Sequence, residues 1–379
     1  MFQKVVFGLN RWLAMNCYPI ALFSEVSEDQ LHNYNYAASL PIDKVEKRFG
    51  MRKDNWNMTL QRNVILNDTY QIRQVLTSSE LAIVYVGRNR QTGAKVAIKE
   101  FFPHRIAARQ TDKRSVFCAS KGYGGQFHDL LSAFLQEGEL LSSLKHPHII
   151  TYVDHFEANG TGYLVTEYCT GMILTDYLQE RNHALQADFI TETLLPLVDT
   201  LDYIHKQGIL HRDVKPSNVM VMEDGTPKLL DFGSAVRWPM PSGAKPTIFT
   251  SKGYSPLEFY SEKSEQGPMS DIYSLSALLH YWTCGQPPMD VKRRLFIDEL
   301  PSVRKHNEYV NPWLARVIHW GLVVRSEKRC TSLSWVRRSL RVQALVWKVR
   351  KPGTVEWMLE ENEHTQVYEP EPKKQHETA

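Results

Sequence analysis

Two polar motifs at a fixed separation constrain this chain more than any other feature. The first runs from His211 to Asn218 and contains Asp213; the second, eighteen residues after Asp213, runs from Asp231 to Gly233. Either core, His-Arg-Asp or Asp-Phe-Gly, is most often a loop turn when it occurs alone. Both together, in order and with the asparagine in place, supply a carboxylate that can orient a hydroxyl and two side chains that can hold a metal ion.

These motifs, with Lys215 two residues after Asp213, resemble the catalytic segments of eukaryotic-type (Hanks-type) serine/threonine protein kinases. The resemblance implies that Asp213 orients the acceptor hydroxyl and that Lys215 stabilises charge near the γ-phosphate. It also implies that Asn218 and Asp231 bind Mg²⁺, or Mn²⁺ in its place, on ATP. Arg212 marks the class in which a phosphorylated activation loop docks on a buried arginine.

The resemblance covers about residues 70–340 and implies an α+β fold, the two-lobed protein kinase fold. A small antiparallel-β lobe with one main helix would occupy residues 69–168, and a larger, mainly helical lobe residues 169–342. Apolar patterning predicts a helix over 127–144 and strands over 70–75, 82–86, 95–100, 150–156 and 163–168. Residues 103–125 are expected to form a polar insertion. Residues 99–103 and 253–256 are most similar to bacterial members of the family.

The resemblance also identifies the residues expected around the nucleotide. Lys99 would contact the α- and β-phosphates, and Glu137 would pair with Lys99, with Glu139 as its competitor. Thr166 takes the gatekeeper position, beside two hinge residues whose backbone would meet the adenine edge. The full nucleotide set is Leu76, Thr77, Ser79, Val84, Ala97, Lys99, Glu137, Thr166, Glu167, Cys169, Asn218 and Asp231.

The loop expected over the phosphates departs from the family pattern. Thr77, Ser79 and Ala82 occupy the three positions at which the family has glycine, which lets the backbone approach the phosphates closely. Glu80 adds a negative charge that would oppose phosphate binding if it pointed inward. This departure motivates an alternative function, a pseudokinase that acts as a scaffold or binding module.

The segment from Gly253 to Glu258 resembles the end of a kinase activation segment. Glu258 is expected to form a buried ion pair with Arg329, and Asp271 to cap the catalytic loop as a scaffolding residue. Three hydroxyls are candidate phosphosites in this segment, and an unmodified loop residue is the alternative for each: Thr247, Thr250 and Ser251.

Composition narrows the class of protein. The 379 residues carry a net charge of +3, too small to indicate nucleic acid as the main partner. The five cysteines are scattered and form no Cys-x-x-Cys pair, a pattern typical of reduced thiols in the cytoplasm rather than of a disulfide framework or a zinc site.

The two ends of the chain match no defined motif. Within the extension over residues 1–68, the interrupted apolar stretch 5–23 is a poor transmembrane span. It is expected to form a helix that packs on its own domain, with peripheral membrane contact as the alternative. The acidic residues 343–379 have the composition of a disordered tail. That tail could fold back on the basic residues between 313 and 352.

The sequence therefore predicts a cytoplasmic enzyme that transfers the ATP γ-phosphate to Ser/Thr hydroxyls of protein substrates and autophosphorylates. The pseudokinase is the first alternative. A small-molecule kinase of related fold is the second, although such enzymes generally lack the Arg-Asp-x-Lys pattern and a recognisable activation segment. Oligomeric state does not follow from the sequence.

Overall fold

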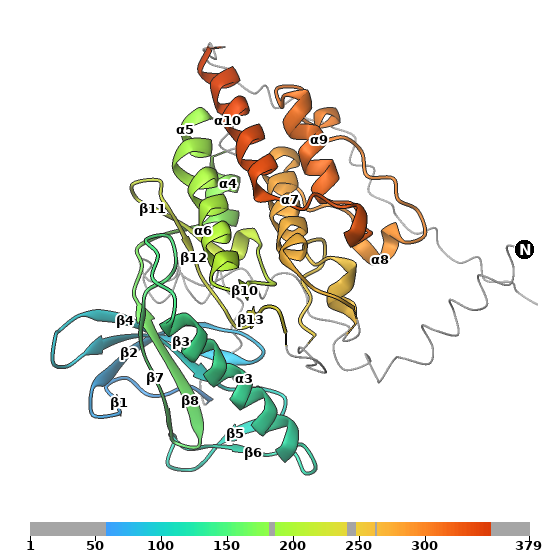
Figure 1. Ribbon diagram of the computed structural model, residues 1–379. Coiled ribbons are helices and arrows are strands. Elements are labelled where there is room, and N and C mark those ends of the chain that lie inside the picture. Colours follow the sequence, from blue (N-terminus) through green and yellow to red (C-terminus); the bar gives the residue numbers. More distant parts are fainter. Residues whose placement is uncertain (1–57, 182–185, 241–247, 262–263, 350–379) are drawn as a thin grey trace, which may run out of the picture.

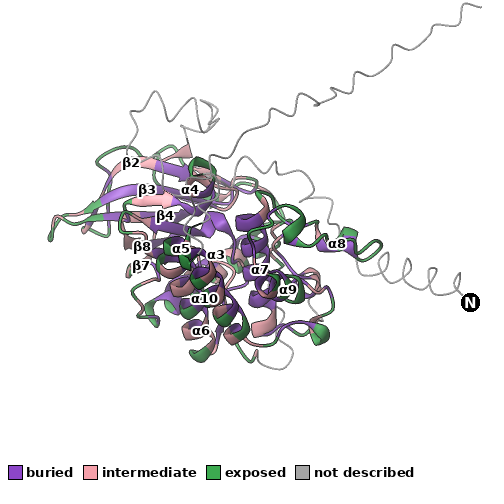
Figure 2. Cartoon of the chain, turned by 90° about the horizontal axis from the view of Figure 1, so that it is seen from above, coloured by how far each residue is buried: buried purple, intermediate pink, exposed green. Residues whose placement is uncertain are grey.

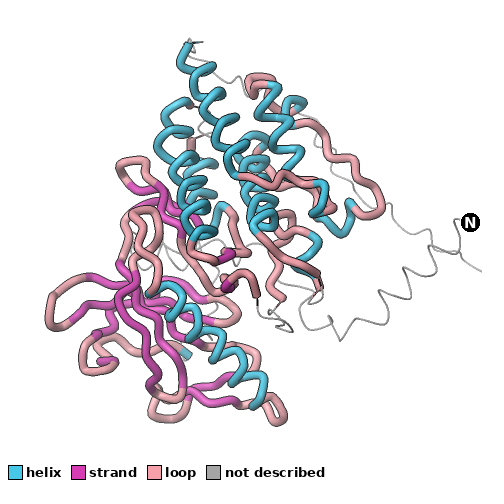
Figure 3. The backbone as a smooth tube through the Cα atoms, in the orientation of Figure 1, coloured by secondary structure: helices cyan, strands magenta, loops and turns pink. Residues whose placement is uncertain are grey.

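The computed structural model describes residues 58–181, 186–240, 248–261 and 264–349. They form two lobes, with most strands and helix α3 in one and the remaining helices in the other (Figures 1 and 3). This is the two-lobed α+β architecture predicted from the sequence. Among the described residues, no helix combines the length and apolar character that a bilayer span requires. The stretch 5–23 and the tail beyond residue 349 lie outside the described residues.

The small lobe is built on a six-stranded antiparallel sheet. Its strand order is β1-β2-β3-β4-β8-β7. The bounds are Ile65–Leu66 (β1), Tyr70–Ser78 (β2), Ala82–Asn89 (β3), Lys95–Phe101 (β4), Tyr152–Ala158 (β7) and Thr161–Glu167 (β8). The five strands expected from the sequence are all present. Strand β4 lies inside the sheet, paired to β3 on one side and β8 on the other, which holds its backbone in place at both edges.

Helix α3 (Gly124–Ser142) packs on β7 and β8 and begins three residues before the helix predicted from Phe127. Phe127, Leu131 and Phe134 are buried at the spacing of one helix face, and Glu137 shares that buried face one turn later. A carboxylate on an apolar helix face requires a charged partner, and the partner lies in the site described below.

The insertion after β4 is not only polar. It contains a hairpin of β5 (Ala107–Arg109) and β6 (Val116–Cys118), and the side chains of Ala107 and Val116 are buried in the small-lobe core. Residues 58–66 also contribute to this core, through the buried side chains of Leu60, Val64 and Leu66. The core of the small lobe therefore includes residues upstream of position 69.

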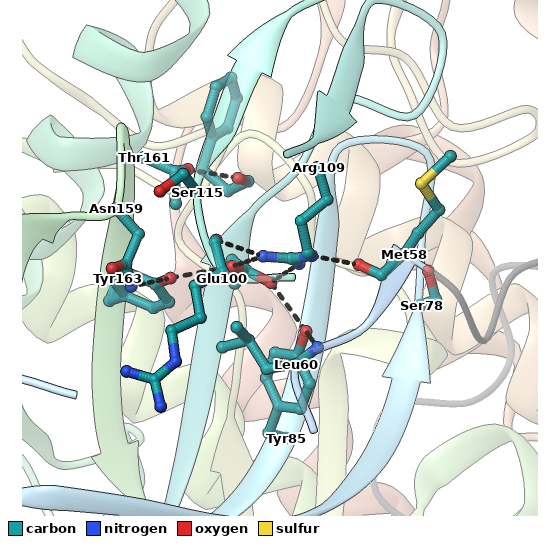
Figure 4. Close-up of polar contacts among 12 residues, drawn as sticks. Met58, Leu60, Ser78, Tyr85, Glu100, Arg109, Ser115, Asn159, Thr161 and Tyr163 are labelled. Carbon is teal, nitrogen blue, oxygen red and sulfur yellow. Dashed lines mark hydrogen bonds and ion pairs between the residues drawn. The ribbon is translucent and has the colours of Figure 1, made fainter. Parts of the chain in front are cut away.

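A buried polar network joins the insertion to strand β4 (Figure 4). Glu100, the neighbour of Lys99, is fully buried, because successive strand residues face opposite sides of a sheet. Arg109 donates to both of its carboxylate oxygens, at 3.0 and 2.7 Å. The hydroxyls of Tyr85 and Tyr163 also donate to Glu100, at 2.7 and 2.9 Å. The buried charge is thus paired and fully hydrogen-bonded.

The same network reaches the start of the described chain. Arg109 Nε donates to the Met58 carbonyl at 2.8 Å, and the Leu60 N–H donates to the Tyr85 hydroxyl at 3.0 Å. Met58 and Leu60, which precede strand β2 in the sequence, are thereby connected through Arg109 and Tyr85 to the carboxylate of Glu100 (Figure 4).

The large lobe is mainly helical, with short strands next to the small lobe. Helix α7 (Pro268–Cys284) is buried along nearly its whole length (Figure 2). The other helices are α4 (Leu174–Glu180), α5 (Ala187–Phe189), a π-helical turn (Ile190–Leu194), α6 (Leu195–Lys206), α8 (Val291–Arg294), α9 (Pro312–Gly321) and α10 (Leu333–Val349), with 3₁₀ turns at Pro216–Asn218, Leu257–Tyr260, Val303–Lys305 and Ser326–Lys328. The strands are β9 (Gly171–Ile173), β10 (Ile209–Leu210), β11 (Val219–Met222), β12 (Pro227–Leu229) and β13 (Val236–Arg237). Helix α10 extends past residue 342, the expected domain end.

Candidate active site

Lys99 on β4 lies at the centre of a charge cluster between the lobes. Its Nζ is 2.9 Å from Glu137 Oε2 on α3 and 2.9 Å from Asp231 Oδ1, which follows β12 in the large lobe. The expected Lys99–Glu137 pair is therefore present, and the competing Glu139 is exposed to solvent. Residues separated by up to 132 positions in sequence meet at one ammonium group.

The two carboxylates of this cluster respond differently to burial. Burial raises the pKa of Glu137 to about 7, against the attraction of Lys99. Burial also acts to raise the pKa of Asp231, but Lys99, Lys215 and the hydrogen bond from the Gly233 N–H together outweigh burial and hold that pKa well below the usual value. Asp231 is consequently ionised at neutral pH, whereas Glu137 titrates near neutrality.

Asp213 lies in the loop over residues 211–218 and has three side-chain partners. Its Oδ1 accepts a hydrogen bond from Ser251 Oγ at 2.7 Å, and its Oδ2 accepts one from Asn218 Nδ2 at 2.8 Å. Lys215 Nζ lies 2.9 Å from the same Oδ2 and donates to Ser251 Oγ at 2.8 Å. A carboxylate, an ammonium group and a serine hydroxyl are therefore in mutual contact.

The backbone of this loop is held by Asp271 at the N-terminal end of α7. Its carboxylate accepts from the N–H groups of His211 at 2.9 Å and Arg212 at 2.8 Å, and from His205 Nε2 at 2.8 Å. Arg212 has a φ of 66°, a left-handed conformation that non-glycine residues seldom adopt. The hydrogen bonds that these N–H groups donate to Asp271 compensate for this strain and fix the direction of the backbone that leads to Asp213.

Asn218 and Asp231 fit a magnesium site by their chemistry. The Asn218 amide nitrogen donates to the Asp213 carboxylate and also to the Asp213 backbone carbonyl, both at 2.8 Å, so the nitrogen is used and the amide oxygen remains as an acceptor. Asp231 is ionised and uses Oδ1 toward Lys99. Two oxygen ligands from protein, completed by phosphates and water, are typical of Mg²⁺ on a nucleotide.

A cavity lies next to Lys99, between the sheet and the large lobe. Eight of the predicted nucleotide residues line it: Val84, Ala97, Lys99, Glu137, Thr166, Glu167, Cys169 and Asp231. Asn218 is not among the lining residues, and sequence reasoning missed the apolar side chains that form the floor and walls of the cavity: Leu141, Ile150, Leu164, Leu230 and Phe232. Leu76, Thr77 and Ser79 belong to the β2–β3 hairpin and are not among the lining residues. Apolar walls with a few charged groups at one end are typical of a site for a flat ring that carries an anionic group.

Glu167 has a second function in the hinge that the sequence did not reveal. Its Oε1 accepts from the N–H of Thr151 at 2.8 Å, from the Thr151 hydroxyl at 2.7 Å and from Lys228 Nζ at 2.6 Å. These bonds lower the pKa of Glu167 despite the opposing effect of burial. Because Lys228 belongs to β12, this carboxylate connects the hinge to the large lobe.

Hydrogen bonds between Ser79 and Ala82 stabilise the turn of the glycine-free loop between β2 and β3. Ser79 N–H donates to the Ala82 carbonyl at 2.8 Å, and the Ala82 N–H donates to Ser79 Oγ at 3.2 Å. Glu80, at the tip, pairs with Arg105 Nε at 2.7 Å. Its charge is therefore balanced outside the cavity, which removes the objection that it opposes phosphate.

Two of the three candidate phosphosites fall within the described residues. Thr250 is exposed, Ser251 contacts Asp213, and Thr247 lies outside the described residues. The ion pair expected at the end of the activation segment is present: Arg329 Nη1 is 2.6 Å from Glu258 Oε1. Both side chains are buried, and Ser270 Oγ adds a 2.8 Å hydrogen bond to Glu258.

Comparison with known proteins agrees with this geometry. Residues 70–340 match the model of the protein kinase domain family. The chain is 28% identical over 225 residues to serine/threonine-protein kinase PLK4 of Nematostella vectensis, covering 59% of this chain and 21% of that protein. It is 26% identical over 318 residues to calcium-dependent protein kinase 4 of Plasmodium falciparum, covering 79% of this chain and 56% of that protein. The chain thus spans between about a fifth and just over half of these two relatives.

A solved structure gives the same result for the fold. The apo form of PpkA-294 superposes with a TM-score of 0.66 at 29% sequence identity, over 75% of this chain and 99% of that one. The family match covers well over half of the chain, and the described residues contain every motif that carries it except for a short part of the activation segment. The chain belongs to the protein kinase domain family.

Proposed function

We propose that this protein is a serine/threonine protein kinase that uses ATP and Mg²⁺ and acts in the cytoplasm on protein substrates, itself included. The observation that carries the proposal is the position of Lys99, which bridges Glu137 and Asp231 at 2.9 Å. Catalytically competent kinases require the ion pair between the phosphate-binding lysine and the helix glutamate, and they also require the metal-binding aspartate in place.

In this proposal each group has a separate task. The cavity walls take the adenine, with the backbone of Glu167 and Cys169 along its edge. Lys99 holds phosphate oxygens, and Glu137 keeps Lys99 in position. Asn218 and Asp231 would hold Mg²⁺, which neutralises charge on the phosphates when bound.

Asp213 and Lys215 would act on the acceptor. Asp213 Oδ1 already accepts a hydrogen bond from a serine hydroxyl, that of Ser251, at 2.7 Å. An acceptor Ser or Thr would be oriented by the same oxygen and would transfer its proton to it as the hydroxyl attacks the γ-phosphorus. The bond between the γ-phosphorus and the β,γ-bridging oxygen would break, and ADP would leave. Lys215 is within reach of the same place, 2.8 Å from Ser251 Oγ, where negative charge develops during transfer.

The pseudokinase remains the alternative to test, because the phosphate loop lacks its glycines. Against it, Lys99, Asp213, Asn218 and Asp231 are all retained, and the charges of Lys99 and Asp231 are already brought together. Decayed kinases usually lack at least one of these groups.

Autophosphorylation of the purified chain with labelled ATP and Mg²⁺ tests the proposal, beside the Asp213→Ala variant and followed by phosphosite mapping. We expect label on Thr247, Thr250 or Ser251 that disappears in the variant. Asp202→Ala, which alters a surface carboxylate on α6, serves as the matched control. Failure of the wild-type chain to bind Mg·ATP would favour the scaffold. Label on metabolites but never on protein would favour a small-molecule kinase.

A further inference from the structure

Residues 102–105, which follow β4, lie along the tip of the β2–β3 hairpin, and we call them the strap. Two backbone hydrogen bonds join the strap to the tip. Phe102 N–H donates to the Leu81 carbonyl at 2.8 Å, and His104 N–H donates to the Glu80 carbonyl at 3.0 Å. The strap therefore continues the β3–β4 pairing beyond the end of both strands.

Two side-chain contacts add to these bonds. His104 Nε2 is 2.8 Å from Ser78 Oγ, and Arg105 Nε is 2.7 Å from Glu80 Oε1. The strap itself is anchored at Phe102, whose side chain is fully buried in the small-lobe core and packs edge-on against the His104 ring at 5.0 Å. Both sides of the hairpin tip are consequently attached to a segment that is fixed in the core.

We propose that the strap positions the phosphate loop, residues 77–82, for nucleotide phosphates, with His104 and Arg105 as positioning residues. The inference rests on the proposed use of ATP. In this proposal, the conformation of the glycine-free loop is held by contacts with a segment outside the loop.

Backbone geometry explains how the strap acts. In a glycine-rich loop the backbone can move toward the phosphates and present its N–H groups, whereas Thr77, Ser79 and Ala82 carry a Cβ that restricts this movement. Carbonyl and N–H of one trans peptide point in opposite directions. A hydrogen bond that fixes the Glu80 carbonyl on His104 therefore also fixes the direction of the Leu81 N–H. A loop arranged in advance loses less conformational entropy when the nucleotide binds.

The ion pair sets the direction of the charged side chain at the tip. A partly exposed pair of this kind contributes little to stability by itself. Its effect is local, because it turns the Glu80 carboxylate toward Arg105 and balances its charge outside the cavity. We therefore expect nucleotide affinity to depend on whether the Glu80–Arg105 pair is intact, rather than on the sign of the charge at either position alone.

Charge-reversal variants of the full chain test this inference. Binding of Mg·ADP and of adenosine is measured by calorimetry, together with kcat and the KM for ATP. We expect Arg105→Glu to weaken Mg·ADP binding about five- to tenfold and adenosine binding less than about twofold. Glu80→Arg should also weaken Mg·ADP binding, because two arginines at the tip repel each other. The double variant Glu80→Arg/Arg105→Glu should restore affinity to within about threefold.

The direction in which Glu80→Arg changes Mg·ADP affinity distinguishes positioning by the strap from direct electrostatic attraction of phosphate. If Glu80→Arg bound Mg·ADP more tightly, direct attraction of phosphate would explain the result and the strap would be overturned. Equal losses for adenosine and Mg·ADP would also overturn it, since the damage would then extend to the whole cavity.

His104 provides an uncharged test with a conservative rescue. His104→Ala removes the contact with Ser78 and should raise the KM for ATP with little change in kcat, whereas His104→Gln keeps a nitrogen near Nε2 and should restore it. Arg114→Glu is the matched control, because it makes the same charge change at an exposed turn of the same insertion. If the wild-type chain transfers phosphate and the strap variants bind Mg·ADP as tightly as it does, the positioning role of the strap would be contradicted while the proposed function would stand. A wild-type chain without phosphate transfer would contradict the proposed function.

Discussion

Asp271 accepts a 2.8 Å hydrogen bond from the backbone N–H of Arg212 and thereby holds a non-glycine residue at a φ of 66°. The same carboxylate binds the N–H of His211, so two consecutive peptide units of the catalytic loop are fixed from one helix end. The loop residue that follows, Asp213, has little freedom to turn. The position of the proposed catalytic carboxylate is therefore determined by a residue 58 positions further along the chain.

Asp271→Ala is expected to reduce both stability and phosphate transfer. It leaves two buried N–H groups without an acceptor and removes support for the strained Arg212 backbone, at a cost of about 2–4 kcal/mol in the free energy of unfolding. Urea denaturation and kcat measure the two effects. Asp202→Ala, whose partners Lys206 and Arg337 are on the surface, should cost less than about 1 kcal/mol. Equal stability losses in the two variants would contradict the proposed anchoring.

Glu137 predicts a pH dependence of phosphate transfer. Its pKa is raised to about 7, so the carboxylate that pairs with Lys99 is lost as pH falls below neutrality. We expect kcat/KM for ATP to decrease from pH 8 to pH 6, and this limb to be absent in Glu137→Gln, which should have low activity at every pH. An acidic limb that persists unchanged in the variant would assign the titration to another group.

The raised pKa of Glu137 also predicts that the free energy of unfolding decreases with rising pH, opposite to the expected increase in activity. A carboxyl group whose pKa is higher in the folded state binds its proton more tightly there, so its contribution is complete below the unfolded pKa of about 4.5. That contribution is lost as pH rises from about 4.5 to about 7. Glu137→Gln should remove this decline, with a slope difference of at most about 1.4 kcal/mol per pH unit. Comparison of the two unfolding profiles isolates this group from the buried histidines, whose lowered pKa values act in the opposite direction.

The buried pair of Arg329 and Glu258 predicts a large asymmetry between single and double substitution. Arg329→Met leaves the Glu258 carboxylate buried without its ion-pair partner and should cost about 3–5 kcal/mol. The double variant Glu258→Gln/Arg329→Met should recover a substantial part of that loss in thermal or urea unfolding. Arg337→Met, which breaks partly exposed pairs with Asp199 and Asp202, is the control and should cost less than about 1 kcal/mol.

Deleting residues 353–379 is expected to raise phosphate transfer at low salt. The tail carries seven acidic residues and two lysines, and α9 and α10 expose Arg316, Arg338 and Arg341. If the tail occludes a surface through these charges, the activity ratio of deleted to full chain should approach one at high salt. A ratio of one at every salt concentration would contradict the occlusion.

The parts of the site that the sequence predicted are those fixed by short motifs. Asp213, Lys215 and Asn218 occupy one loop of six residues, so their proximity follows from spacing alone. Lys99 and Glu137 were identified through the resemblance to the kinase family, which places a lysine on this strand and a glutamate on the following helix. The exposure of Glu139 is also consistent with the helix period, because residues two positions apart face different sides.

The parts that were missed depend on contacts without a sequence pattern. Nothing in the polar composition of residues 103–125 indicates that Arg109 meets Glu100 or that His104 meets Ser78, because such contacts require the fold to bring separate strands together. The apolar lining of the cavity was missed because Leu141, Ile150 and Leu230 look like ordinary core residues. Glu80 could not be assigned a direction before its partner Arg105 was located.

The Glu100 network has a consequence for where the small lobe begins. The family match starts at residue 70, yet Met58 and Leu60 supply hydrogen-bonding groups to the arginine and tyrosine that hold Glu100. A chain that began at Tyr70 would leave Arg109 Nε without its acceptor and would remove the donor to the Tyr85 hydroxyl. The region that matches the family is therefore shorter than the folded small lobe, because Leu60, Val64 and Leu66 lie in the same apolar core as Val96 and Ile98 of the strand that carries Lys99.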